Sequence, residues 1–366
     1  MLINTKDQIT TTQATLIVWN TIIGVGILMS PREIATKVGT PDGWISVLLG
    51  GFIALLAGYI LAKLSQRFPG QTFYQYSQIV AGKFLGKVHG FILIIYYTFF
   101  AGYEVRGMGE LIHMYLLQNT PIEVIIIAFI SVVTYITVEG ANPIARICEF
   151  FFPVIFIIIL VLCAFSFGDF ELDNVRPVLG DGVMPVLKGV QSTALSMGGF
   201  DVMLLFTAFM KEPNKAVKAT LLGIGLIIPV YTLIVVVSFG VLTVDDIQTL
   251  TWPMVEVSKS IELPGGFFER FELLLLILWV ITIYTTVICY YYVASLGLGQ
   301  LFQKDHKKFV YGLLPVIYII AMYPDNLNSV FKFGNYLGYA AMGIVGIMPS
   351  YFLIIAKIRR KGLGKN

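Results

Sequence analysis

Long hydrophobic runs dominate the sequence, and short polar segments separate them. An α-helix rises about 1.5 Å per residue, so about 20 apolar residues cross the roughly 30 Å hydrocarbon core of a bilayer. The runs are Thr12–Met29, Trp44–Leu64, His89–Leu117, Pro121–Val138, Ile144–Phe167, Val183–Phe209, Ala216–Leu242, Phe267–Leu298, Phe309–Tyr323 and Asn335–Lys357. They predict an all-α integral membrane protein with ten transmembrane helices, of which the ninth is the weakest.

The composition excludes a soluble protein. The 366 residues are 57% hydrophobic and 13% charged, whereas soluble domains carry roughly 25% charged residues. We therefore interpret residues 1–366 as one membrane domain in contact with the lipid bilayer. The net charge of +3 is too small to indicate nucleic acid binding. The chain shows no catalytic motif, no cofactor motif and no His, Cys, Asp or Glu cluster with metal spacing, so we expect no enzyme, no cofactor and no metal.

The distribution of charge predicts the orientation in the membrane. If the N-terminus lies in the cytoplasm, most lysines and arginines fall in segments on the cytoplasmic side, including the cluster at 357–365. The long connection at 168–182 is acidic and falls outside. This distribution satisfies the positive-inside rule, so we expect a multi-pass protein with both termini in the cytoplasm. In the other long outer connection, residues 243–266, the sequence predicts a short amphipathic helix at Trp252–Ile261.

Two of the hydrophobic runs are interrupted near their centres by glycine. Gly24 and Gly26 interrupt the first run, and Gly198 and Gly199 interrupt the sixth. Glycine in a helix interior costs about 1 kcal/mol, and a break releases backbone groups that lipid cannot satisfy. Such a break is tolerated where it lines a polar cavity. The alternative is that these glycines only permit close helix packing, but their matched placement favours a binding site.

The position of the breaks predicts the architecture. Breaks in helices one and six of ten mark two halves of five helices, residues 12–167 and 183–357. An odd number of helices per half gives the two halves opposite orientations, which is the inverted-repeat, LeuT-like transporter design. A half-helix N-terminus suits a carboxylate and a half-helix C-terminus suits an ammonium group or a cation. The pattern therefore predicts a zwitterionic amino acid bound at mid-membrane.

Ionisable residues occur inside two of the predicted spans. Glu104 lies near the middle of the third span, where it is either a functional group or part of a structural ion-pair network. Arg106 and Glu110 are four residues apart and can pair on one helix face, which favours a structural role. Asp201 follows the second break and either binds a cation or ligand amine or caps the second half-helix; capping is the favoured role.

Several stretches, taken in order, resemble the B subunit of spore germinant receptors, a branch of the amino acid–polyamine–organocation permease superfamily. The residues that carry the resemblance are 20–28 (NTIIGVGIL), 40–45 (TPDGWI), 104–106 (EVR), 176–180 (RPVLG), 252–253 (WP), 269–272 (ERFE), Asp325 and 336–339 (YLGY). The resemblance extends over essentially the whole chain. It implies a five-plus-five fold in the spore inner membrane and a complex with a larger A-type subunit and a lipoprotein C-type subunit.

The resemblance also implies a role and a binding site. The implied role is the detection of a small germinant, usually an amino acid, between spans one, three, six and eight. At the matching positions this implies the ligand-binding residues Gly24, Gly26, Tyr96, Phe100, Gly198, Gly199, Thr285 and Thr286. The alternatives are an amino-acid permease and an ion conduit within a receptor complex. Span five lacks the lysine that proton-coupled relatives can carry, which argues against coupled transport.

Overall fold

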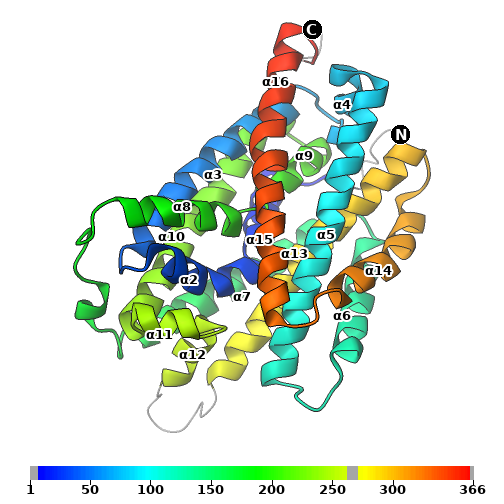
Figure 1. The fold of residues 1–366 in the computed structure, drawn as a ribbon. Helices are drawn as coiled ribbons and strands as arrows, with labels where there is room; N and C mark the ends of the chain where they lie inside the picture. Colours follow the sequence, from blue (N-terminus) through cyan, green and yellow to red (C-terminus); the bar gives the residue numbers. More distant parts are fainter. Residues whose placement is uncertain (1–6, 262–270, 363–366) are drawn as a thin grey trace.

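The protein is built from helices that follow the predicted hydrophobic runs. The computed structural model describes residues 7–261 and 271–362, and in these residues the extended structure is limited to one bridge between Ile9 and Met210. The α-helices are α1 Thr11–Ile22, α2 Val25–Val38, α3 Gly43–Gln66, α4 Phe73–Ala81, α5 Lys83–Tyr115, α6 Ile122–Thr137, α7 Ala141–Ser166, α8 Met184–Ser196, α9 Met203–Phe206, α10 Ala216–Val241, α11 Val244–Thr249, α12 Pro253–Ser260, α13 Phe271–Phe302, α14 His306–Met322, α15 Leu327–Ala341 and α16 Met348–Ile358. Short 3-10 turns (η2 Leu172–Val175, η3 Phe200–Val202, η4 Thr207–Phe209, η5 Pro213–Lys215) and a π-helical segment (η6 Met342–Ile347) complete the set. Figure 1 shows how these helices are arranged in space.

The prediction of an all-α membrane fold is confirmed. Within the described ranges, six helices are long and apolar enough to cross a membrane, and the pair α1 and α2, bent by 49° at a short break, forms a seventh candidate. The fourth, sixth and ninth predicted spans correspond to α6, to α8 with α9, and to α14, which are shorter or interrupted. The count of ten therefore stays a prediction. The predicted start of the eighth span at Phe267 lies outside the described residues.

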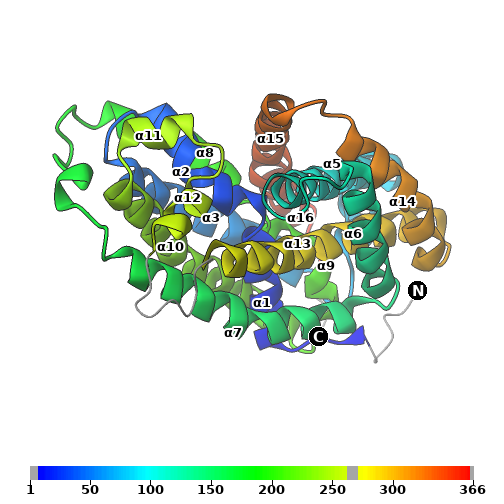
Figure 2. The same ribbon diagram turned by 90° about the horizontal axis from the view of Figure 1, so that it is seen from below.

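The central helices hold the bundle together. α5 packs along α13 and α14, α3 packs along α10, and α1 lies between α10 and α7. Seen from below, α2, α8 and α11 gather on one side and α6 and α14 on the other, with α5 and α13 between them (Figure 2). Large apolar side chains such as Phe52, Phe84, Tyr135 and Ile319 remain exposed on the outside of the bundle. Such a surface would be a liability in water but suits contact with lipid tails.

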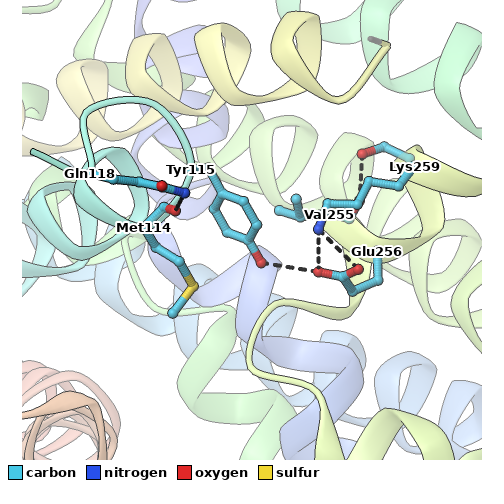
Figure 3. A network of polar contacts seen from close by, with 7 residues as sticks. Met114, Tyr115, Gln118, Val255, Glu256 and Lys259 are labelled. Carbon is cyan, nitrogen blue, oxygen red and sulfur yellow. Dashed lines mark hydrogen bonds and ion pairs between the residues drawn. The ribbon is translucent and has the colours of Figure 1, made fainter. Parts of the chain in front are cut away.

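A polar contact joins α12 to the end of α5. The Tyr115 hydroxyl donates to Glu256 Oε1 over 3.2 Å, and Lys259 Nζ lies 2.9 Å from the same oxygen and 4.9 Å from the centre of the Tyr115 ring (Figure 3). The helix predicted at Trp252–Ile261 is confirmed as α12, with Pro253 at its first position. This contact fixes a short surface helix to the longest helix of the core.

A glycine on α10 sets how closely α1 and α10 approach. A Cβ atom built on Gly223 would lie 2.7 Å from Val18 and 2.8 Å from the Thr15 carbonyl oxygen, whereas a Cβ on Gly225 would have no atom of the described residues within 4 Å. Both glycines lie in the same helix, and Gly225 is exposed. They therefore form a matched pair in which helix propensity is equal and packing differs.

We expect Gly223→Val to lower the free energy of unfolding by about 1–3 kcal/mol, because the added methyl groups force α1 away from α10. Gly225→Val is the control and should leave stability nearly unchanged. The measurement is thermal unfolding of the two purified variants in the same detergent. Equal midpoints for the two variants would contradict the assigned α1–α10 contact.

Candidate ligand-binding site

The two helix breaks meet in the interior of the bundle. α1 ends at Ile22 and α2 begins at Val25, while α8 ends at Ser196. Gly199 has φ +126°, and a Cβ atom there would lie 2.7 Å from the Thr21 carbonyl oxygen and 2.8 Å from the Ile22 nitrogen. Glycine is required because it accepts this backbone conformation and allows one break to touch the other. The breaks therefore form one structural unit rather than two separate kinks.

One hydroxyl group forms hydrogen bonds with the last carbonyl of each of the two broken helices. The Tyr231 hydroxyl lies 3.1 Å from the Ile22 carbonyl oxygen and 2.8 Å from the Ser196 carbonyl oxygen. Tyr231 comes from α10, where it is almost completely buried. A buried carbonyl without a partner is costly in the membrane interior, so this hydroxyl stabilises both ends. The sequence analysis missed Tyr231, since tyrosine is abundant along the chain and none of its neighbours marks it.

The N-terminal end of α2 is occupied by a side chain of the protein. Glu104 Oε2 accepts a hydrogen bond from the Val25 amide over 2.9 Å. A Cβ atom built on Gly24 would lie 2.6 Å from both carboxylate oxygens, so the absence of a side chain there makes room for Glu104. A carboxylate at a helix N-terminus is stabilised by the free amides and the helix dipole. Glu104 thus lies where the sequence pattern places the carboxylate of a ligand.

The other buried charges have partners of their own. Arg106 pairs with Glu110 at 2.8 Å, as their spacing predicts, and also donates to the Ala321 carbonyl oxygen over 3.2 Å. Asp201 Oδ1 accepts a hydrogen bond from the Gly199 amide over 3.0 Å, so it binds the backbone of the break two residues before it. Neither η3 nor α9 has a side-chain cap, so the predicted capping of the second half-helix by Asp201 is wrong. These contacts leave Arg106 unavailable as a counter-charge for Glu104.

A small cavity lies where the breaks meet. Its volume is about 30 Å³, which is room for no more than a few water molecules. The residues that line it are Thr21, Ile22, Gly26, Glu33, Phe100, Tyr103, Glu104, Ser196, Gly198 and Gly334. They come from α1, α2, α5, α8 and α15 and from the second break. The cavity thus offers less space than an amino acid needs.

The structure brings some predicted residues to this cavity and not others. Gly26, Phe100, Glu104 and Gly198 line it, and Gly24 and Gly199 shape the breaks beside it. Tyr96, Thr285 and Thr286 are buried and are not among the described residues that line the cavity.

Those three buried residues have their own surroundings. The ring of Tyr96 lies 5.5 Å from that of Phe100, and its hydroxyl has no hydrogen-bond partner among the described residues. Thr285 donates to a carbonyl of its own helix, while Thr286 also lies 3.0 Å from the Asn20 carbonyl oxygen. Thr286 therefore ties α13 to the end of α1.

Two further cavity residues could have been found by spacing. Glu33 follows Gly26 by seven residues, about two helical turns, so both lie on one face of α2. Tyr103 lies three residues after Phe100, next to Glu104, on the same side of α5. Ser196 has no such signal, because its place depends on where α8 ends.

The fold and the paired helix breaks define the class of protein. The chain shares its fold with the crystal structure of MhsT in complex with L-phenylalanine, with a TM-score of 0.71 over 94% of this chain and 88% of MhsT at 12% sequence identity. It is therefore a multi-pass α-helical membrane protein of the LeuT-like fold, as predicted.

Sequence relatives identify the family within that class. Residues 8–330 match the family described as "Spore germination protein". The chain is 43% identical to spore germination protein YndE of Bacillus subtilis, over 97% of this chain and 98% of YndE. It is 34% identical to spore germination protein A2 of the same organism, over 97% and 98% of the two chains. The chain belongs to the spore germination protein family and is a germinant-receptor subunit of the B type, which confirms the resemblance found in the sequence.

Removing the hydroxyl that joins the two breaks should destabilise the bundle. We expect Tyr231→Phe to lower the free energy of unfolding by about 1–3 kcal/mol, because the Ile22 and Ser196 carbonyls lose their shared donor. Tyr290→Phe is a matched control, since the Tyr290 hydroxyl is buried and has no hydrogen-bond partner within residues 7–261 and 271–362. Thermal unfolding of both variants in detergent makes the comparison. A Tyr290→Phe effect as large as that of Tyr231→Phe would refute the bridging role.

Proposed function

We propose that this chain is the germinant-sensing membrane subunit of a spore germination receptor. In this proposal a small germinant, an amino acid, binds at the cavity between the broken helices. Binding then changes how the two five-helix repeats, residues 12–167 and 183–357, pack against each other. The change passes to A-type and C-type subunits in the spore inner membrane, with both termini of this chain in the cytoplasm. The chain performs no catalysis in this role.

The observation that carries the proposal is the small volume of the cavity at the meeting point of the breaks. Its volume of about 30 Å³ is too small for an amino acid, so a ligand that binds there must favour a more open arrangement. A ligand shifts a conformational equilibrium only as far as it binds one state better than the other. A site that must open to accept its ligand binds the ligand better in the open conformation than in the closed one. This geometry suits a sensor, because the output of a sensor is the change in the populations of the two conformations.

The glycine that makes room for Glu104 provides a test in spores. We expect Gly24→Val to abolish the germination response to L-amino acids, because the new side chain pushes the Glu104 carboxylate off Val25 and into the cavity. Gly312→Val is the control, since a Cβ there would meet no atom within 4 Å in the part of the chain that the structure describes. Receptor level is followed by immunoblot. A normal response from Gly24→Val spores at a normal receptor level would place the binding site elsewhere.

A second candidate function is substrate transport, since the chain shares its fold with Mhp1, a nucleobase-cation-symport-1 family transporter. The two functions differ in whether the ligand crosses the membrane. The purified chain is reconstituted in sealed liposomes and exposed to a labelled amino-acid mixture. We expect saturable binding without accumulation inside the vesicles. Accumulation that is lost in Gly24→Val would instead establish a permease.

A further inference from the structure

The charged side chains that line the cavity are both carboxylates, although Lys37 and Arg32 lie near one of them, Glu33. Glu33 and Glu104 line it, and none of the described residues that line it is a lysine, arginine or histidine. Glu104 is 2% exposed and lines the cavity, and within the described residues its carboxylate accepts one hydrogen bond, from the Val25 amide to Oε2. A buried carboxylate without a counter-charge is costly, so this site favours a positively charged group.

The end of α2 that would attract a ligand carboxylate is already filled. The Val25 amide donates to Glu104, and the space over Gly24 is taken by both Glu104 oxygens. A second carboxylate placed there would face the charge of Glu104 at close range, which is unfavourable. The carbonyl ends of α1 and α8 are likewise engaged by Tyr231. The helix ends therefore do not fix the direction in which a zwitterion binds.

A second cavity lies next to the first and carries the opposite charge. It has a volume of about 230 Å³ and is lined by Lys37 and Lys332, together with neutral side chains such as Gln191 and Asn335. Both cavities are lined by residues of α2, α8 and α15. On α2, Lys37 follows Glu33 by four residues, about one helical turn. The second cavity thus has its cations on α2 and α15, while the first has its carboxylates on α2 and α5.

We propose that the ligand is a primary amine or amino acid that binds with its ammonium group at Glu104 and Glu33. The carboxylate of an amino acid then points toward Lys37 and Lys332. This orientation is the reverse of the one that the helix dipoles alone predict, and it makes the ammonium the required group. The inference rests on the proposed function, since it concerns the same site.

The test uses three families of probes on the purified full chain in detergent at neutral pH. The amino acids are L-alanine, L-valine and L-phenylalanine. Each is compared with its decarboxylated amine (ethylamine, isobutylamine, phenethylamine) and its deaminated acid (propanoate, 3-methylbutanoate, 3-phenylpropanoate). The readout is the concentration that half-saturates the rise in thermal unfolding midpoint. We expect stabilisation by at least one amino acid and its amine, and none by the matching acid.

Variants separate the two ends of the ligand. Glu104→Gln keeps an acceptor for the Val25 amide but removes the charge, and it should weaken both amine and amino acid by roughly tenfold or more. Glu33→Gln, which leaves the start of α2 untouched, should weaken both in the same direction. Lys37→Gln with Lys332→Gln should weaken the amino acid and spare the amine. Glu139→Gln, at an exposed position after α6, is the control and should change neither.

The outcomes distinguish the inference from the function on which it rests. If the acids stabilise the chain and the amines do not, the orientation is wrong while the site stands. If Glu104→Gln and Glu33→Gln both bind amino acids as tightly as the parent chain, the two carboxylates are not the ammonium site, and the inference fails. If none of the nine compounds stabilises the chain, the proposed amino-acid site itself is overturned.

Discussion

Every backbone group that a broken helix frees inside a bilayer needs a partner from the protein, and this requirement organises the centre of the molecule. Lipid offers no hydrogen bonds, so an interrupted helix persists only where neighbours supply them. Here the Tyr231 hydroxyl donates to the last carbonyls of α1 and α8. The Glu104 carboxylate accepts from the first amide of α2, and the Asp201 carboxylate accepts from the Gly199 amide. α5, α10 and the second break are thereby positioned around one point.

The same requirement explains the glycines better than flexibility does. Gly199 allows the second break to touch the backbone of the first, and Gly24 leaves space for the Glu104 carboxylate. Gly223 likewise leaves space for α10 to approach α1 closely. At each of these positions a side chain would collide with a specific neighbouring atom, which explains why the residue is glycine.

The sequence predicted the parts of the fold that depend on local pattern. Run length and hydropathy are local quantities, so the helices and both breaks could be located from the chain alone. Partner choice is not local, because Tyr231 reaches two helix ends that are far from it in sequence. The role of Glu104 at α2 likewise depends on how α5 packs. Glu33 lies between these cases, since its seven-residue spacing from Gly26 places both on one face of α2.

The occupied helix ends change what the breaks contribute to recognition. Free amides and carbonyls at a half-helix end would bind a zwitterion by its own charges. In this protein the first amide of α2 and the last carbonyls of α1 and α8 are engaged by side chains. The breaks then bend the helices and leave room for the cavity, while the side chains that line the cavity determine which ligand binds. A substitution at Glu33 can therefore alter the ligand without altering the breaks, whereas at Glu104 only a replacement that keeps an acceptor for the Val25 amide can do so.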